Sequence, residues 1–505
     1  MNKAKENNLT AERFDISCSF EAVCDHTMPE YYPEIRRVVS VTATPLPDSK
    51  FLSGNTLEFG GCVAFSMLYI GEDGSLSVLP CTCEYSERAA LPEEIRGTAE
   101  AVVDVSLSDA SFRVTAPRRV TLRAKLRARI TSDKAVSCIE SAMEGEKPCD
   151  MATCRTIKTL RRTVPTAVRG SASQTGSASG EWKAPSGTKV ISCPGTVHIT
   201  EVKAKNGAGV VRGDVVLKCL VFTDKGVYSS QKIKLPFEEV VSDEEIREGD
   251  EVAAYGRVAS SSVGEEPEGS GEFKAEAEID LCLKWMRGSE CSILCDAYST
   301  AFEMTPERKD TAAVSPLCCV SSSLSVNGSG TRSSRPREGE YLVDVDLTPR
   351  FEKAEISDGK AVFSGNILAK AYIAGEGDVT AEEFTLPLRF ECRCDDGEGD
   401  VVWWADAVAV DSVGRLEGDT VAVSGEICLA ISAHRRNKLS PVTVMQIQRG
   451  EPRGEREAEL RVIYPDGGER LWDIAKHCGA DIDAVERVNG ISRDDEAKAP
   501  VVIPM

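Results

Sequence analysis

The chain has 505 residues, of which 41% are hydrophobic and 28% charged, which is typical of a folded protein with three or four domains of ordinary size. Its formal net charge of −21 argues against nucleic acid as a partner, because phosphate binding needs a basic surface. Residues 1–10 are polar, and no uncharged apolar run approaches the ~20 residues that cross a bilayer, so we expect a cytoplasmic protein without direct membrane insertion. The 19 cysteines are an odd number in a long chain, which favours reduced thiols over a disulfide framework.

Three glycines mark an internal repeat. Gly61, Gly213 and Gly365 are spaced by 152 residues, and each lies at the start of a strand-length apolar run. A turn-like glycine follows each run: Gly74, Gly226 and Gly377. Equal spacing with matching context indicates duplication.

Each unit also contains a segment in which apolar and polar residues alternate: residues 119–130, 273–286 and 420–433. Alternation with period two predicts a half-buried strand. In the first segment the residues expected to face the core are Val120, Leu122, Ala124, Leu126, Ala128 and Ile130. We therefore predict a mainly β protein with three tandem antiparallel repeats at residues 1–150, 151–305 and 306–440. The Ser- and Gly-rich tracts 169–182 and 321–340 are expected to be loops or flexible linkers.

The pattern changes at the C-terminal end. Residues 441–458 are expected to be a linker, and residues 459–505 predict a small βααβ domain. Its two helices have apolar faces formed by Leu471, Ile474 and Ala475, and by Ile482, Val485 and Val488. Gly479 is expected to end the first helix, and Asn489 with Gly490 the second.

This C-terminal segment resembles a LysM domain, a family that binds N-acetylglucosamine chains in a groove formed by two loops. The matching residues are Tyr464, Gly468, Leu471, Trp472, Ile474, Ala475, Asn489, Ile503 and Pro504. The family's Asp-Thr or Asp-Ser before the first helix is replaced by Glu469 and Arg470, and the second loop reads "DDEAKAP" without its usual glycine.

Both departures lie in segments that line the family's sugar groove, so we expect the loops to bind a protein. The resemblance implies these contact residues: Asp466, Gly467, Gly468, Glu469, Arg470, Leu471, Trp472, Asn489, Gly490, Ile491 and Ser492. Trp472 itself could be a stacking platform or a core residue, and core packing is the favoured interpretation.

Residues 28–43, "MPEYYPEIRRVVSVTA", resemble the opening of a SPOCS domain, and the second and third repeats match it more weakly. SPOCS repeats followed by a LysM domain resemble the SipL-like family of spore coat morphogenetic proteins. The resemblance implies a non-enzymatic scaffold in the mother-cell cytosol, at the forespore surface. Its partners would be the spore coat morphogenetic ATPase, bound by the LysM-like end, and other coat proteins. The alternative is a cell-wall or spore-cortex protein that binds peptidoglycan through N-acetylglucosamine polymers.

No catalytic or cofactor site is expected. The four histidines lie in no Ser-His-Asp or Cys-His arrangement, and His477 is expected to face solvent. Several cysteines lie close in sequence without the paired Cys-x2-Cys sets of structural zinc, so we expect no metal and interpret them as core residues. They are Cys24 with His26, Cys81 with Cys83, Cys291 with Cys295, and Cys392 with Cys394.

One surface feature concerns the repeats themselves. The outer face of the first alternating segment is a basic strip of Arg119, Arg123, Lys125, Arg127 and Arg129. The matching face of the second carries Lys274, Glu276, Glu278, Asp280 and Lys284. Our hypothesis is that the basic strip contacts an acidic surface, on the second repeat or on a neighbouring protein. The alternative is two solvated faces.

Overall fold

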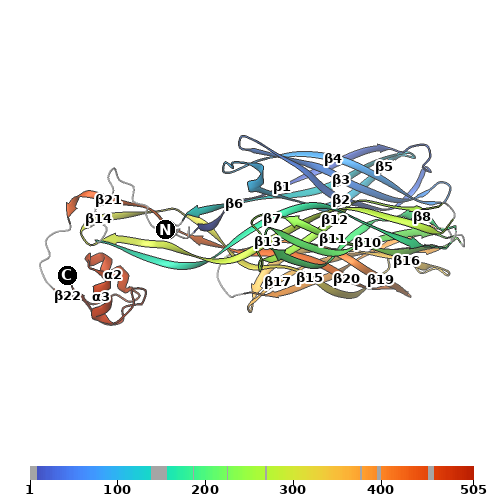
Figure 1. The fold of residues 1–505 in the computed structure, drawn as a ribbon. Coiled ribbons are helices and arrows are strands. Elements are labelled where there is room, and N and C mark those ends of the chain that lie inside the picture. Colours follow the sequence, from blue (N-terminus) through green and yellow to red (C-terminus); the bar gives the residue numbers. More distant parts are fainter. Residues whose placement is uncertain are drawn as a thin grey trace.

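The computed structural model describes residues 8–137, 156–185, 187–223, 226–267, 270–375, 378–394, 400–452 and 460–504. The protein is mainly β, and the strand pairs joined within its sheets are antiparallel. A small helical region lies at the C-terminal end (Figure 1). The predicted fold class is confirmed.

Repeat 1 has six strands and one short 3-10 helix, η1 (Thr98–Glu100). The first, sixth and fifth strands form one sheet, and the second, third and fourth form the other. A hydrophobic core lies between these two sheets. The strands are β1 (Asn8–Thr27), β2 (Ile35–Ser53), β3 (Thr56–Gly71), β4 (Leu76–Ala90), β5 (Ala101–Ala116) and β6 (Arg119–Ser137).

The same arrangement recurs twice, except that the second strand of repeat 2 is divided into two pieces. Repeat 2 comprises β7 (Ile157–Lys183), β8 (Lys189–Ser192), β9 (Gly195–Lys205), β10 (Ala208–Phe222), β11 (Tyr228–Ser242), β12 (Glu251–Glu265) and β13 (Glu272–Ser299). Repeat 3 comprises β15 (Thr311–Thr331), β16 (Tyr341–Ser357), β17 (Lys360–Gly375), β18 (Asp378–Arg393), β19 (Asp400–Glu417) and β20 (Thr420–Leu439).

The three equidistant glycines have the same structural role in each repeat. Each lies on the third strand, opposite a β-bulge in the strand before it. The bulged chain comes so close that a side chain would collide with backbone. An added Cβ would lie 2.3 Å from the Leu46 carbonyl oxygen at Gly61, 2.0 Å from that of His198 at Gly213, and 2.0 Å from that of Arg350 at Gly365. Of the three turn glycines, Gly74 and Gly226 have positive φ angles, and Gly377 lies outside the described residues.

The alternating segment of repeat 1 is strand β6, which lies between β1 and β5 in its sheet. Its six predicted core residues, from Val120 to Ile130, are all buried. This prediction is confirmed, because a period-two pattern reports burial on one face directly.

The prediction that the two Ser- and Gly-rich tracts are loops was wrong for residues 169–182 and 321–331, whereas residues 332–340 lie in no helix or strand, as predicted. Residues 169–182 belong to β7, and residues 321–331 belong to β15, the first strands of repeats 2 and 3. The glycines are there because large side chains of the facing sheet or neighbouring strand occupy the space a Cβ would need. A Cβ at Gly170 would lie 2.6 Å from the Trp285 ring, and one at Gly330 would lie 2.1 Å from Phe384. Tertiary packing therefore overrides the loop propensity of these residues.

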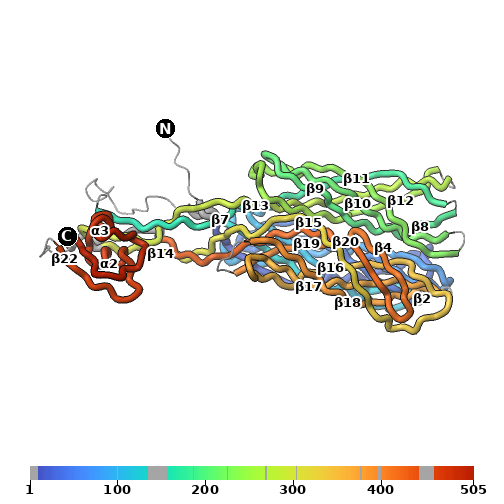
Figure 2. The backbone as a smooth tube through the Cα atoms, turned by 90° about the horizontal axis from the view of Figure 1, so that it is seen from below, coloured from blue at the N-terminus to red at the C-terminus, as the bar shows by residue number. Residues whose placement is uncertain are grey.

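Strands β7 and β13 are the longest in the protein and pair with each other along their whole length, from Lys183 opposite Glu272 to Ser299 opposite Ile157. Their outer ends project beyond the packed repeats as a two-stranded arm (Figures 1 and 2). Strands β14 (Phe302–Arg308) and β21 (Val442–Pro452) pair beside it, so the segment expected as a linker contains a strand. The C-terminal module lies against this arm.

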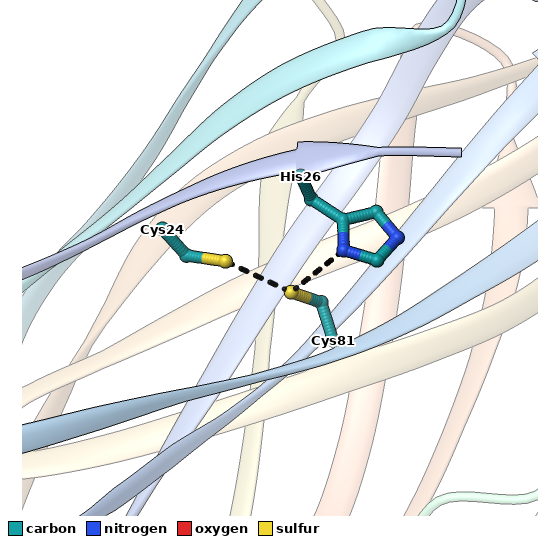
Figure 3. A group of neighbouring side chains, drawn as sticks. All are labelled: Cys24, His26 and Cys81. Carbon is teal, nitrogen blue, oxygen red and sulfur yellow. Dashed lines mark hydrogen bonds between the residues drawn. The ribbon is translucent and has the colours of Figure 1, made fainter. Parts of the chain in front are cut away.

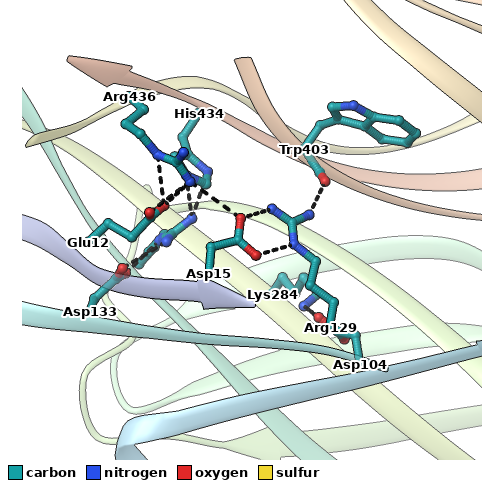
Figure 4. A network of polar contacts seen from close by, with 10 residues as sticks. Glu12, Asp15, Asp104, Arg129, Asp133, Lys284, Trp403, His434 and Arg436 are labelled. Carbon is teal, nitrogen blue, oxygen red and sulfur yellow. Dashed lines mark hydrogen bonds and ion pairs between the residues drawn. The ribbon is translucent and has the colours of Figure 1, made fainter. Parts of the chain in front are cut away.

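The three repeats are joined side by side. A bridge between Ala11 and Ala313 links the sheets of repeats 1 and 3 into one six-stranded sheet. Beside it, charged side chains from all three repeats form a network (Figure 4). Its contacts between repeats include Arg436 to Glu12 at 2.7 Å, Arg169 to Asp133 at 2.6 Å, Arg169 to His434 at 2.6 Å, Lys284 to Asp104 at 3.1 Å, and Arg129 to the Trp403 carbonyl at 2.5 Å.

Candidate docking site

The C-terminal module has the predicted βααβ order: β22 (Leu460–Ile463), α2 (Leu471–Cys478), α3 (Ile482–Asn489) and β23 (Val501–Pro504). Strands β22 and β23 pair antiparallel. Gly479 and Gly490 adopt the left-handed conformation directly after the helices and end them as predicted. Asp481 begins α3 by accepting a hydrogen bond from the Asp483 amide.

The predicted apolar faces of the helices are buried with one exception. Leu471, Ile474 and Ala475 of α2 are in the core, but Val488 of α3 is 54% exposed. Six positions after Ile482, it points to a different side of a helix with 3.6 residues per turn, so its assignment to the buried face was wrong.

Helix α2 begins without a side-chain cap, because Arg470 stands at the capping position. The second loop supplies the missing acceptors instead. The amide of Leu471 donates to the Asp495 carbonyl, and the amide of Trp472 donates to the Arg493 carbonyl, each at 3.1 Å. The two loops are also joined by a bond of 2.9 Å from the Ala497 amide to the Glu469 carbonyl. Backbone carbonyls of the second loop therefore supply the acceptors that a capping side chain would otherwise provide.

Trp472 joins the module to the arm. Its side chain is completely buried, and its Nε1 donates a hydrogen bond of 2.9 Å to Asp296 on β13. Its ring packs edge-on against Tyr298 with centroids 5.0 Å apart. The Tyr298 hydroxyl in turn donates to the Ala480 carbonyl at 2.8 Å. Trp472 is thus a core residue shared between module and arm.

The surfaces of the arm and of the C-terminal module that face each other carry complementary charges. The acidic group of the arm, Asp296, lies 2.7 Å from the ammonium group of Lys476 in α2. Burial raises the pKa of Asp296, but hydrogen bonds from Lys476 and Trp472 outweigh burial and hold that pKa below its ordinary value. A second contact has the charges reversed, with the cation on the arm: Lys158 lies 2.6 Å from Asp481 and 2.9 Å from Asp483 of the module. The module is therefore held by reciprocal charge pairs around a shared apolar core.

Three of the predicted contact residues have structural roles. Leu471 and Trp472 are fully buried. The Asn489 side chain donates to the carbonyls of Val485 and Val502 and accepts from the Val502 amide, so it ties α3 to β23.

The other predicted contact residues are at least partly exposed in the two loops: Asp466, Gly467, Gly468, Glu469, Arg470, Gly490, Ile491 and Ser492. His477 is exposed, as predicted. The Gly468 amide in the first loop donates a hydrogen bond of 2.9 Å to the side-chain carboxylate of Glu496 in the second loop.

An exposed apolar strip beside these loops was missed. Leu460 and Val462 are alternate residues of β22 and are 58% and 48% exposed, and Tyr464 after the strand is 79% exposed. Alternate strand residues share one face, so the period-two spacing of these three residues in "LRVIY" could have revealed it. We call Leu460, Val462 and Tyr464 the tip strip. Exposed apolar residues grouped in this way are typical of protein contacts.

The basic strip lies on β6 as expected. Arg119, Arg123, Lys125 and Arg127 are exposed. Arg123 lies 3.6 Å from Glu21 on the neighbouring strand β1. Arg129 is only 25% exposed and forms an ion pair of 2.6 Å with Asp15, also on β1. In the acidic face of repeat 2, Lys284 is buried against Asp104 of repeat 1.

Two internal features also have functional interest. Cys24, His26 and Cys81 meet inside repeat 1, although the sequence spacing gave no metal motif. A cavity of about 370 Å³ lies where the three repeats face one another. Its most buried cation, Lys218, is paired with Asp344 at 2.9 Å and Asp346 at 2.8 Å, so its charge is already neutralised by the protein.

Among the described residues, no helix combines the length and apolar character needed to span a bilayer. Comparison with known proteins gives no relative: no protein-family model matches the sequence, and neither the curated proteins nor the solved structures contain a significant match.

Proposed function

We propose that this protein is a non-enzymatic scaffold of the spore coat. In this proposal, the three repeats bind coat proteins in the mother-cell cytosol. The C-terminal module docks onto the morphogenetic ATPase at the forespore surface. The assignment to the spore coat is supported by the resemblance of residues 28–43 and 464–504 to SPOCS and LysM sequences.

The observation that carries the scaffold proposal is the position of the module. It lies on an arm beyond the packed repeats (Figure 1). The tip strip and the carboxylates of the two loops are exposed. Because the module lies at one end of an elongated body and the packed repeats at the other, a partner of the module and a partner of the repeats can be bound at the same time without colliding. Several weak contacts on one chain then give tight attachment through effective concentration.

Protein binding is favoured over glycan binding by the roles of two residues. Sugar recognition commonly uses an exposed aromatic ring, and Trp472 cannot have that role because it is buried against Tyr298. The exposed ring of the module, Tyr464, belongs to the apolar tip strip. The polar atoms of the Asn489 side chain are occupied by backbone hydrogen bonds. The exposed loops instead carry carboxylates at Asp466, Asp494 and Asp495, which suit a partner with basic groups.

The test measures binding of the full chain to two purified ligands: the morphogenetic ATPase and a hexamer of N-acetylglucosamine. The full chain is needed because Leu160 and Tyr298 of the arm belong to the core of the module. We expect saturable binding of the ATPase and none of the glycan. Glycan binding without ATPase binding would instead support the peptidoglycan alternative.

A further inference from the structure

Cys24, His26 and Cys81 form a compact group between the two sheets of repeat 1 (Figure 3). Cys24 and His26 are alternate residues of β1 and point to the same side, and Cys81 comes from β4 in the facing sheet. The two sulfur atoms lie 3.1 Å apart, and Cys81 Sγ lies 3.6 Å from His26 Nδ1. The possible ligand atoms all lie within 4.8 Å of one another.

These positions are occupied by apolar residues in the other repeats. In each repeat the first strand pairs with the last one, and the register of this pairing identifies equivalent positions. His26 lies opposite Val120 in repeat 1, Trp182 opposite Phe273 in repeat 2, and Gly330 opposite Val421 in repeat 3. The equivalents of Cys24, His26 and Cys81 are Gly180, Trp182 and Ile233 in repeat 2, and Gly328, Gly330 and Phe384 in repeat 3. Packing of this site therefore requires no sulfur or imidazole. Repeat 1 alone has metal-ligand side chains there.

The histidine is an unusual residue for a purely structural role at this place. Its Nε2 atom is buried and has no hydrogen-bond partner among the described residues. A buried polar atom without a partner is destabilising, so the ring is expected to be retained for another reason. Binding a metal through Nδ1 would be such a reason.

The geometry suits a zinc ion. Zinc binds cysteine sulfur at about 2.3 Å and histidine nitrogen at about 2.0–2.1 Å, so tetrahedral ligands lie roughly 3.8 Å apart for two sulfurs and 3.6 Å for sulfur and nitrogen. The distance from Cys81 to His26 already has this value, and the sulfurs need to separate by only about 0.7 Å. Two thiolates also cancel the charge of Zn²⁺, so no net charge is buried.

We propose that Cys24, His26 and Cys81 bind Zn²⁺ between the two sheets of repeat 1. Both thiols lose their protons to solvent when the ion binds, and no electron is transferred. The bound ion would link β1 to β4, and its fourth position would be open to water. This proposal replaces the expectation from sequence that these residues only pack in the core.

The test uses the full chain, reduced and freed of metal by a chelator, with Zn²⁺ and Co²⁺ as probes. We expect one Zn²⁺ per chain to remain bound through gel filtration, and Co²⁺ to give a sulfur-to-metal charge-transfer band. Cys24→Ser should lose both signals, and His26→Gln should lose the retained zinc. Cys18→Ser is the control, because this cysteine of β1 lies outside the group, and it should keep both.

Thermal unfolding distinguishes lost binding from lost folding. Zn²⁺ should raise the Tm of the wild-type chain and of Cys18→Ser, and should leave that of His26→Gln unchanged. The proposal is overturned if the reduced wild-type chain retains no Zn²⁺, or if both Cys24→Ser and His26→Gln retain it. Formation of a Cys24–Cys81 disulfide in air, by a chain that binds no zinc when reduced, would overturn it in favour of a redox pair.

Discussion

The Nε1 atom of Trp472 donates a hydrogen bond of 2.9 Å to Asp296, across 176 residues of sequence. This contact fixes the C-terminal module on the arm, since the same carboxylate also binds Lys476 at 2.7 Å. The tryptophan that most resembles a ligand-binding residue in the sequence is therefore part of an internal interface.

Replacing Asp296 by Ala should loosen the module. The change removes the acceptor of a buried indole N–H and one ion-pair partner of Lys476, which costs about 1–3 kcal/mol. Hydrogen exchange of the α2 amides should accelerate by roughly tenfold for each 1.4 kcal/mol lost. Asp109→Ala, at an exposed position of β5, is the control and should change nothing. Unchanged protection of α2 in Asp296→Ala would contradict the shared interface.

Replacing Gly213 by Ala should destabilise repeat 2 severely. The new methyl group would lie 2.0 Å from the His198 carbonyl oxygen, and that backbone is held in a sheet. We expect a loss of about 3 kcal/mol or more in the free energy of unfolding, measured by chemical denaturation. Gly264→Ala is the matched control, because no atom lies within 4 Å of its added Cβ. Equal stability of the two variants would show that the bulge can move aside.

Acid should weaken the junction between the repeats through His434. Burial lowers the pKa of this histidine well below its ordinary value, and the guanidinium groups of Arg169, Arg129 and Arg436 lower it further. The unfolded chain takes up a proton below about pH 6.5, whereas the folded chain resists protonation. The free energy of unfolding should therefore fall by up to about 1.4 kcal/mol per pH unit as the pH drops below 6.5.

Denaturation at pH 7.5 and pH 5.0 measures this effect. The wild-type chain should lose more stability between the two values than His434→Gln, which cannot take up the proton. Asp133 also faces this group through Arg169, and it is present in both the wild-type chain and the variant, so the comparison isolates His434. An identical pH dependence of variant and wild type would exclude His434 as the sensitive group.

Substitutions in the basic strip should have two different effects: Arg129 should contribute to folding stability, and the exposed Arg123 and Arg127 should contribute to partner binding. Arg129 is held between Asp15 and the Trp403 carbonyl, so Arg129→Gln should cost about 2–3 kcal/mol of folding stability. Arg127→Gln should cost under about 0.5 kcal/mol, because the residue is exposed. Reversing Arg123 and Arg127 to Glu should then reduce association with an acidic partner without unfolding repeat 1. Unchanged self-association and coat assembly in this variant would leave the strip as a solvated face.

The sequence predicted those features that depend only on residues close together along the chain. The core face of β6, from Val120 to Ile130, followed from alternation alone. The helix ends at Gly479 and Gly490 followed from the conformational freedom of glycine. The strand at residues 169–182 could not be predicted, because Trp285, more than 100 residues away, occupies the space above Gly170. The meeting of Cys24 with Cys81 likewise depends on the packing of two sheets.

In the proposed function, the tip of the arm binds protein. The most direct test is the affinity of the full chain for the purified morphogenetic ATPase, compared between wild type and Val462→Asp/Tyr464→Asp, two substitutions in the exposed tip strip. We expect the double variant to lose at least tenfold in affinity with an unchanged Tm. An affinity equal to that of the wild-type chain would contradict it.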